Sequence, residues 1–331
     1  MKIMITGASG YIGNKLAHVL AEQGHQVHAF VRSDNADHLL QHERIRIFYG
    51  NMLQPSTIRQ AMAGCQQVYH AAGLAKLWTK DPSDFYLHNV IGTENILAAA
   101  LEMGVKKLVY TSTCGVWANS MLHPLTETDP RTNSYDNDYD LSKCLAEKSV
   151  REYCHKGLFT VIVNPPRVYG PGISTHSNAV NRFLSYLINS RIAFIPSANE
   201  VQANYAFIDD VVNGHLLAME KGLGGERYIL GGENASYRRL IQLVKASSQL
   251  KNVLLPLPNV LARLFSCIEL IRAKISTHDP VIVPGVLRRL AISKTFDCNK
   301  AIRQLGYTIT PLEKGIAITV DFLKNSYGNS H

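Results

Sequence analysis

The opening stretch constrains the fold more than any other part of the chain. An apolar run at residues 2–6 leads directly into three glycines spaced three residues apart, and a helical run to about residue 23 follows. Strand, glycine turn and helix in this order are typical of a dinucleotide-binding fold, because the glycines let backbone amides approach a pyrophosphate and the helix amino end adds partial positive charge. The predicted phosphate-binding residues are Gly7, Ser9, Gly10, Tyr11, Ile12 and Gly13.

Apolar strands and helical runs then alternate with short connections. The expected strands are 26–32, 45–49, 67–71 and 107–112, and the expected helices begin near residues 56 and 83 and around Tyr139. This alternation predicts a parallel sheet that is covered on both faces. We expect an α/β protein with a Rossmann-type doubly wound parallel sheet and a smaller, mainly helical C-terminal substrate lobe. The expected division is 1–172, with returning segments at about 203–231, and 173–331.

The end of the second strand bears on which cofactor is bound. An NAD enzyme usually places an acid there to bond the ribose hydroxyl, and this acid would repel a phosphate. Here Val31 takes that place and Arg32 follows, whose guanidinium can make a bidentate contact with a 2′-phosphate. Asp34 is the alternative, because a loop that folds back would let it act as the NAD acid. We expect NADP(H), with NAD(H) as the alternative.

Other polar and small residues fall at the carboxyl ends of successive strands, where ligands of parallel sheets bind. Asn51 can bond the adenine, and the small run 71–73 leaves room for the middle of the cofactor. Each would be an ordinary loop by itself, but together they extend the predicted site. The residues expected to contact the cofactor here are Asn51, Met52, Ala71, Ala72, Gly73, Thr111 and Ser112.

Tyr139 and Lys143 are the predicted centre of the chemistry. Residues four apart share one face of a helix. A lysine cation beside a phenol favours the phenolate and lowers the phenol's pKa towards the range useful for moving a proton on an alcohol oxygen. Thr113 ends the strand before this helix, so its hydroxyl can meet the Tyr139 oxygen over a bound carbonyl. Alone, the pattern also fits an exposed helix with an ordinary tyrosine.

The overall composition excludes several classes of protein. The chain has 331 residues, of which 46% are hydrophobic and 18% are charged, as in globular proteins. Its six cysteines show no zinc spacing, so we expect reduced thiols, a cytoplasmic location and no metal. The basic residues behind the net charge of +8 are scattered, so we expect no nucleic-acid partner. We also expect no signal peptide and no membrane-spanning segment.

The chain resembles the extended short-chain dehydrogenase/reductase superfamily, also called the NAD-dependent epimerase/dehydratase family. Over nearly its whole length the motifs follow the order of that family, and the apolar stretch from Val253 and the Arg32 position look most like its dihydroflavonol-reductase and 3β-hydroxysteroid-dehydrogenase branch. The motifs of the family are Gly7-x-x-Gly10-x-x-Gly13, His70-Ala71-Ala72-Gly73, Asn89-Val90-x-Gly92-Thr93, Tyr110-Thr111-Ser112-Thr113, Tyr139-x-x-x-Lys143, the run Asn164 to Gly172, Phe207 to Val211 and Lys300 to Tyr307. The motif Leu77-Trp78-x-x-Asp81-Pro82 also looks most like the named branch.

The resemblance implies roles for these positions. It makes Tyr139 the acid or base, Lys143 the residue that bonds the nicotinamide ribose and polarises Tyr139, and Thr113 the residue that orients the substrate oxygen. Thr113 stands where relatives more often have serine, and Asn51 where they more often have aspartate. Asn89 either supports Lys143 or holds helix and loop together. The resemblance also places Pro166 and Val168 beside the nicotinamide and suggests a homodimer by analogy.

The second half of the chain is expected to form the substrate side. Prolines 165 and 166 end a strand, and segments 205–210 and 227–230 are expected to return to the sheet. Residues 253–275 are rich in leucine and isoleucine. They could pack as lid or core, form a wall for an apolar substrate, or lie on a membrane surface, and we prefer these readings in that order. Candidate substrate residues are Trp78, Trp117 and Tyr169, with core packing as the alternative.

Three functions fit these features. The preferred one is an NADP(H)-dependent oxidoreductase that acts on the ketone, aldehyde or secondary alcohol of a small, largely apolar molecule. The second is an epimerase of a nucleotide sugar or a hopanoid-associated sugar, with lid arginines for a second diphosphate; the candidates are Arg182, Arg191, Arg239 and Arg288. Cys114 and Gly115 follow Thr113 where the family's dehydratases carry acids, which argues against elimination. The last is an NADP-binding regulator without catalysis, whose relatives typically lose the tyrosine and the lysine.

Overall fold

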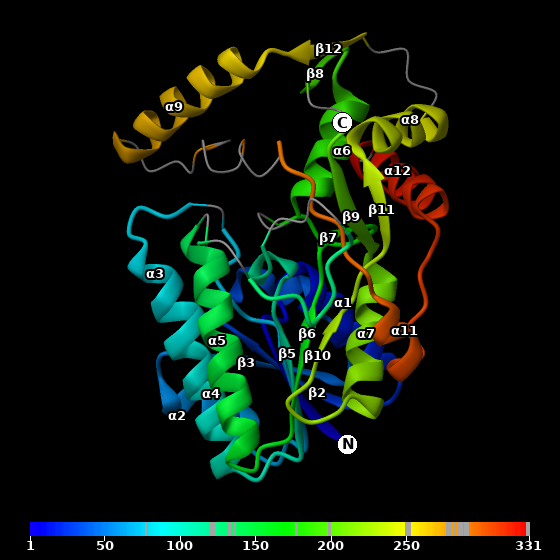
Figure 1. Ribbon diagram of the computed structural model, residues 1–331. Coiled ribbons are helices and arrows are strands. Elements are labelled where there is room, and N and C mark those ends of the chain that lie inside the picture. The colour runs from blue at the N-terminus through cyan, green and yellow to red at the C-terminus, as the bar shows by residue number, and fades with distance from the viewer. Residues whose placement is uncertain are drawn as a thin grey trace.

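A seven-stranded parallel sheet forms the main body of the protein (Figure 1). The computed structural model describes residues 1–76, 78–118, 123–131, 134–135, 137–175, 178–197, 200–248, 253–275, 280, 283, 287 and 291–328. The strand order is β10-β6-β5-β4-β1-β2-β3, and every neighbouring pair is parallel. The strands are β1 (Lys2–Thr6), β2 (Gln26–Val31), β3 (Ile45–Tyr49), β4 (Gln67–His70), β5 (Lys107–Thr111), β6 (Thr160–Asn164) and β10 (Arg227–Ile229). The strand order runs outwards in opposite directions from β1 and β4, which makes the sheet doubly wound and confirms the predicted fold class.

Helices cover both faces of this sheet. Successive residues of a strand point to opposite faces, so Ile3 and Ile5 join one apolar core while Met4 joins the other. The first core is covered by α1 (Tyr11–Glu22), α7 (Ile208–Lys221) and α11 (Asn299–Leu305), and the second by α2 (Pro55–Met62), α4 (Gly92–Glu102) and α5 (Asp138–His155). A sheet buried on both faces reads as nearly continuous apolar runs, which is why the sequence predicted these strands closely.

The helical run before β5 contains an irregular turn. The run comprises α3 (Ser83–Tyr86), a π-helical turn η2 (Leu87–Ile91) and α4. Such turns occur frequently at functional sites because they redirect a side chain out of the regular helix pattern. The buried side chain of Asn89 lies within this one. Two short 3-10 turns, η1 (Asp34–Leu39) and η3 (Cys114–Val116), follow β2 and β5.

The C-terminal region lies above the carboxyl ends of the main strands (Figure 1). Its three-stranded sheet has the order β11-β9-β7, and helices α6, α8 and α12 share one apolar core with that sheet. The elements are β7 (Arg167–Tyr169), β9 (Gln202–Phe207), β11 (Glu233–Ser236), α6 (Ala179–Asn189), α8 (Tyr237–Ser248) and α12 (Leu312–Gly328).

One predicted strand does not return to the main sheet. β10 pairs with β6 as expected, but β9 pairs with β7 and β11 instead, and the chain enters α7 at Ile208. The prediction that segment 205–210 rejoins the main sheet is therefore wrong. The cause lies upstream, because Pro165 and Pro166 interrupt the ladder after β6. β7 thus leaves the main sheet, and its free edge pairs with β9.

A second, smaller extension carries residues 253–275. β8 (Ile192–Pro196) and β12 (Val253–Leu257) form a two-stranded parallel sheet, and β12 leads into α9 (Asn259–Ile275). Figure 1 shows α9 projecting away from α6, α8 and α12. In the described part of the chain, every helix is too short or too polar to cross a bilayer.

Candidate active site

The glycine turn between β1 and α1 is built for close approach. Gly7 has a φ of 72°, and a Cβ added to it would lie 2.7 Å from the Ala72 backbone nitrogen. A Cβ on Gly13 would lie 2.2 Å from the Gly7 carbonyl oxygen. The amino end of α1 has no side-chain cap and no acid in its first turn. Its backbone N–H groups and partial positive charge are therefore available to an anion, and phosphate binding here stays a prediction.

Tyr11 has a structural side chain. Its hydroxyl donates a hydrogen bond to the Gly170 carbonyl oxygen at 2.7 Å, and a Cβ on Gly172 would lie 2.8 Å from its ring. Burial raises the pKa of this phenol. The side chain therefore ties α1 to the turn after β7, and only the backbone of Tyr11 remains for a phosphate. Ser9 and Ile12 are half-buried in the same turn.

The tip of β2 presents a cation. Arg32 is exposed directly after the strand, and Asp34 is exposed in the first turn of η1. Burial lowers the pKa of His88 in the π-helical turn, and the charge of Arg32 lowers it further. Arg32 therefore lies on the side of the strand tips, near η2. Arg32, which would favour NADP(H), and Asp34, which would favour NAD(H), are both accessible to a ribose at this edge.

At the tip of β3, Asn51 is half-buried and its Oδ1 accepts a hydrogen bond from the Leu53 backbone at 3.0 Å. Met52 is buried against Gly92, where a Cβ would lie 3.2 Å from its own Cβ. The amide nitrogen of Asn51 is the part of this side chain that the turn does not use. It is the group available to an adenine ring.

The tip of β4 is held by a neutral histidine. His70 is fully buried, with Nδ1 2.6 Å from Thr6 Oγ1 and Nε2 3.0 Å from Thr93 Oγ1. Burial, with the nearby Lys143 charge, lowers its pKa to about 3, so it is uncharged at neutral pH. Thr6 Oγ1 also accepts a hydrogen bond from the Ala72 nitrogen. His70 thus fixes the 71–73 run beside the glycine turn.

Tyr139 and Lys143 lie on α5, close to the tip of β5. Asn137 caps this helix by accepting a hydrogen bond from the Asp140 nitrogen at 2.8 Å. Tyr139 is half-buried, with its ring 6.2 Å from the Phe85 ring. Lys143 is buried, and its ammonium donates to the Thr111 carbonyl oxygen at 2.7 Å. This bond brings the predicted lysine to the end of the strand that carries Thr111, Ser112 and Thr113.

Burial sets the electrostatics of Lys143. It lowers the pKa of the ammonium to about 7, while the charge of Glu147 acts in the opposite direction. The ammonium also lies 4.2 Å from the centre of the Tyr110 ring, a favourable cation–π geometry. Of its three donors, Thr111 engages one among the described residues, which leaves the others for a ligand.

The hydroxyl groups at the end of β5, on Thr111, Ser112 and Thr113, differ in their hydrogen-bond partners. Thr113 Oγ1 accepts a hydrogen bond from the Gly115 nitrogen at 3.0 Å, so its own hydrogen can still be donated. Thr111 Oγ1 lies 2.9 Å from Nε2 of the buried His215. Ser112 Oγ is buried and has no hydrogen-bond partner among the residues that the structure describes. Ser112 and Thr113 are therefore the hydroxyls with capacity for a ligand.

Asn89 links the loop after β4 to the helix of Tyr139. Its Oδ1 accepts from the Leu74 nitrogen at 2.7 Å, and its Nδ2 donates to Ser142 Oγ at 2.9 Å. The sequence left two roles open for Asn89, which were to support Lys143 or to hold the helix and the loop together. These hydrogen bonds are the ones expected for holding the helix and the loop together. A Cβ on Gly73 would lie 3.0 Å from Asn89 Oδ1 and 3.8 Å from Lys143 Nζ, so the three residues adjoin one another.

Sequence reasoning missed Glu147 and Arg167. Glu147 is fully buried one helical turn after Lys143 and accepts a hydrogen bond from Asn164 Nδ2 at 2.7 Å. Its spacing of four residues from Lys143 was a readable signal. Arg167 follows Pro166 on β7, and its guanidinium donates to the Tyr237 hydroxyl at 2.5 Å. A lone arginine in an apolar run was the signal there.

The predicted substrate aromatics do not gather in one place. Trp117 is 1% exposed and packs against Arg227 and Phe296. Tyr169 is fully buried, and a Cβ on Gly315 would lie 2.2 Å from its hydroxyl oxygen. This packing is that of core residues, the alternative that the sequence left open for both rings.

Trp78 is half-buried in the loop after β4, whereas its predicted neighbour Leu77 lies outside the described residues. Pro166 and Val168 are also half-buried, at the start of β7. Of the lid arginines, Arg182 and Arg191 are exposed, and Arg239 pairs with Glu313 at 3.5 Å. Arg288 lies outside the described residues.

Comparison with known proteins shows which family carries these motifs. Residues 3–231 match the model of the NAD dependent epimerase/dehydratase family. A putative dihydroflavonol 4-reductase of Synechocystis sp. is 30% identical over 329 residues, which cover 97% of this chain and 94% of the relative. A 4-hydroxy-2-methyl-3-oxo-4-farnesyl-3,4-dihydroquinoline-1-oxide ketoreductase of Stigmatella aurantiaca is 29% identical over 315 residues, which cover 93% and 92%.

The fold agrees with a solved structure. The crystal structure of a UDP-glucose 4-epimerase from Thermotoga maritima with UDP-glucose gives a TM-score of 0.80 at 22% identity and covers 99% of this chain and 100% of that one. At that identity the likeness concerns the fold alone. The matches confirm the resemblance drawn from the motifs, including its dihydroflavonol-reductase branch. Proteins of this family bind NAD(P), and they include reductases and epimerases.

Proposed function

Because the chain belongs to the NAD-dependent epimerase/dehydratase family, we propose that it is an NADP(H)-dependent oxidoreductase. It reduces a ketone or aldehyde, or oxidises a secondary alcohol, of a small and largely apolar molecule. One observation carries this proposal. Lys143, buried and with its pKa lowered to about 7, is hydrogen-bonded to the tip of β5 and lies one turn from Tyr139 on α5.

The residues present fit a pyridine dinucleotide. The uncapped amino end of α1 and the tight glycine turn suit a pyrophosphate, and the orphaned Ser112 hydroxyl lies at the strand tip where the middle of the cofactor would rest. Lys143 has donors left for the nicotinamide ribose, and Asn51 has an amide nitrogen left for the adenine. When bound, the nicotinamide supplies or accepts the hydride.

Arg32 is the basis for preferring NADP(H). Its exposed guanidinium follows β2 directly and can pair with a 2′-phosphate through charge-assisted hydrogen bonds. An acid at the strand end would exclude that phosphate, and the acid here, Asp34, comes two residues later in η1. NAD(H) remains the alternative if Asp34 binds the ribose.

Proton transfer is assigned to Tyr139 and its neighbours. In reduction, the Tyr139 hydroxyl donates its proton to the substrate oxygen; in oxidation, the phenolate accepts it. The Lys143 ammonium stabilises the phenolate, because an opposite charge nearby favours the ionised form. Thr113 Oγ1 already accepts from Gly115, so its hydrogen is free to orient the same oxygen.

An apolar substrate agrees with the relatives. The ketoreductase of Stigmatella aurantiaca is named for a substrate with a farnesyl chain. Among the described lid arginines, Arg239 is already paired with Glu313, which makes it less available to a second diphosphate. Sugar epimerisation is the second candidate, because the family includes epimerases and Arg182 and Arg191 stay exposed. A non-catalytic regulator ranks last, since both Tyr139 and Lys143 are present.

The test is oxidoreduction by matched tyrosine variants. Purified protein is mixed with NADPH and a panel of apolar ketones, and the near-ultraviolet absorbance of the reduced nicotinamide is followed. We expect the Tyr139→Phe variant to lose about 10²–10⁴-fold in kcat while it still binds NADPH. Tyr153→Phe, on the same helix, is the control and should keep wild-type activity. Full activity of the Tyr139→Phe variant would refute the assignment, and product formed without net consumption of nicotinamide would favour epimerisation.

A further inference from the structure

In helix α9, the apolar and polar faces are exchanged relative to an ordinary surface helix. Its large apolar side chains face outwards, while its buried face consists of Ala262, Ser266, Glu269 and Ala273. The exposed fractions reach 83% at Ile275 and 76% at Val260. A helix that merely covers a core buries its large apolar residues and exposes its polar ones. Packing as lid or core, which we preferred from the sequence, therefore does not explain the outer face.

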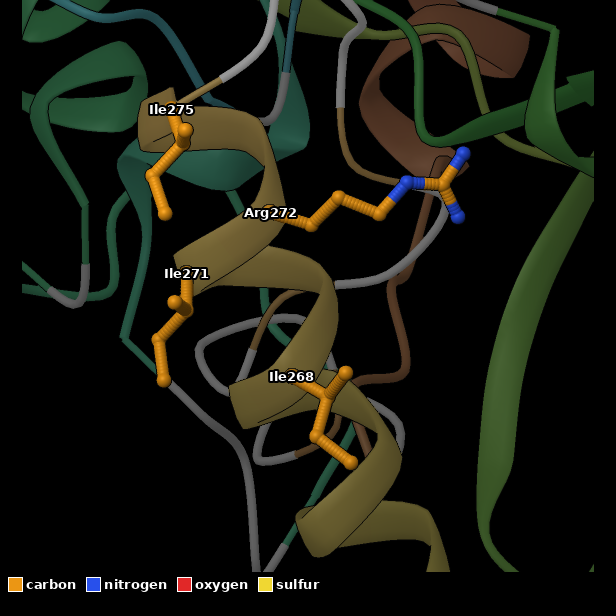
Figure 2. A pocket seen from close by; sticks show the side chains of 4 residues that line it. All are labelled: Ile268, Ile271, Arg272 and Ile275. Carbon is orange, nitrogen blue, oxygen red and sulfur yellow. The ribbon is translucent and has the colours of Figure 1, made fainter.

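The exposed apolar residues of α9 form one continuous stripe. They recur at intervals of three and four residues, which places them on one side of a helix. At about 100° per residue they span an arc of about 120°. The stripe consists of Leu261, Leu264, Phe265, Ile268, Ile271 and Ile275. Figure 2 shows Ile271 and Ile275 on the same side of the helix, with Arg272 pointing away from them. They line a shallow groove of about 480 Å³ with Ile268 and Arg272, and none of these residues belongs to the strand-tip site.

The two-stranded sheet that leads into α9 carries a second exposed apolar face. Ile192 and Phe194 on β8 pair in register with Val253 and Leu255 on β12, so all four side chains share one face of the small sheet. Each of the four is at least 40% exposed, while Ala193 between them is fully buried. Soluble monomers rarely expose many large apolar side chains together, and such a concentration marks a binding surface.

The charges around the stripe are cationic. Arg272 lies within the apolar arc, about 20° from one edge, and Arg263 lies about 80° beyond the other edge. Both are exposed, and they are the exposed ionic side chains among the described residues of α9. The acid of the helix, Glu269, is buried and pairs inward with Arg272 at 3.1 Å. An apolar face accompanied by exposed arginines matches a lipid interface, where the side chains enter the acyl region and the guanidinium groups reach the phosphates.

We infer that α9, with the exposed face of β8 and β12, docks the protein on the surface of an anionic lipid bilayer. The helix lies flat at the interface, along its length of about 25 Å, and does not span the membrane. Its stripe enters the boundary between headgroups and acyl chains, and Arg263 and Arg272 bind lipid phosphates. This docking does not depend on the proposed reaction.

The charges argue against a second copy of the chain as the occupant. A symmetric dimer places the same patch on both partners. Antiparallel pairing of α9 would set Arg263 against Arg272 of the other copy, and parallel pairing would set each arginine beside its equivalent. Both arrangements bring cations together, and the acid of the helix, Glu269, is buried and already paired with Arg272, so it leaves the charge of Arg263 without an offset. An anionic lipid surface supplies the negative charge that a second copy of the helix lacks.

Vesicle flotation tests this inference with the full-length protein. The vesicles consist of phosphatidylcholine alone or with about 30 mol% phosphatidylglycerol. We expect the protein to float with the anionic vesicles and more weakly with the neutral ones. The triple variant Leu264→Gln, Ile268→Gln, Ile271→Gln should bind at least about tenfold more weakly, because binding scales with the apolar area inserted. Arg263→Gln should weaken binding to the anionic vesicles only.

The matched control changes three apolar residues that are exposed on other elements, Leu223→Gln, Ile302→Gln and Ile318→Gln, and it should float like the wild type. Far-ultraviolet circular dichroism and NADPH binding check folding, and the single variant Ile275→Asp replaces the triple variant if the triple variant does not fold.

Absence of flotation, or flotation that the α9 variants leave unchanged, would overturn the inference. So would a wild-type dimer in light scattering that the triple variant converts to a monomer without any lipid binding, because a second copy would then occupy the face.

Discussion

Replacing Lys143 with methionine should stabilise the cofactor-free protein while it removes activity. The buried ammonium has a pKa lowered from its ordinary 10.5 to about 7, chiefly by burial. At about 1.4 kcal/mol for each tenfold change in proton affinity, this corresponds to about 5 kcal/mol of penalty while the ammonium is charged. Methionine avoids the penalty, but the Thr111 carbonyl oxygen loses its 2.7 Å hydrogen bond, at a cost of about 1–3 kcal/mol. We expect a net gain of about 2–4 kcal/mol near pH 6.

The dependence on pH isolates the charge from the hydrogen bond. Because the pKa is lower in the folded state, the penalty is complete below pH 7 and disappears as the pH rises towards the unfolded value of 10.5. It falls from about 5 kcal/mol near pH 6 to about 1.5 kcal/mol near pH 9.5. The lost hydrogen bond does not titrate in this range. The wild type should therefore gain about 3 kcal/mol relative to the variant between these two pH values.

Urea unfolding followed by circular dichroism measures both proteins at the two pH values. Lys148→Met is the control, because Lys148 is exposed on the same helix and should show no such pH-dependent difference. A difference between wild type and Lys143→Met that stays constant from pH 6 to pH 9.5 would contradict the reasoning. The lysine would then not be desolvated in the folded protein.

Two further substitutions test the cofactor site. Arg32→Ser should weaken NADPH binding by about 10–100-fold and leave NADH binding nearly unchanged, since only the 2′-phosphate loses its charge-assisted partner. Fluorescence titration measures both, Arg46→Ser on β3 serves as the control, and an equal loss for the two cofactors would count against the assignment. Gly13→Ala should lower the free energy of unfolding by about 1–3 kcal/mol and weaken cofactor binding, because the new Cβ would lie 2.2 Å from the Gly7 oxygen. Gly224→Ala, whose Cβ would have ordinary contacts from 3.5 Å, should be tolerated, and equal stability of the two variants would contradict the close approach at the turn.

Much of the nucleotide-binding half could be read from the sequence because its signals are local. The apolar run before Gly7 and the helix after it predict one β-α unit, and the strands that follow were placed to within about two residues. The spacing between Tyr139 and Lys143 requires only a helix to bring the two side chains to one face. These features depend on neighbours within a few positions.

Features that depend on distant segments could not be predicted. Nothing local distinguishes a strand that rejoins the main sheet from one that pairs elsewhere, so β9 was placed wrongly. Tyr169 is buried because Gly315, far along the chain, leaves room for its hydroxyl. The apolar composition of 253–275 was plain, but three interpretations remained open because composition does not say which face of a helix is covered.

The amino-acid sequence by itself determined the α/β architecture, the glycine turn and the position of tyrosine and lysine one turn apart on the same helix, since each follows from backbone periodicity or from contacts within one element. Tertiary structure alone decided the burial that lowers the pKa of Lys143, the full burial of Glu147 one turn further along the helix and the outward-facing apolar stripe of α9. Desolvation is a property of all the surroundings of a group, and the segments that create those surroundings are brought together only by folding.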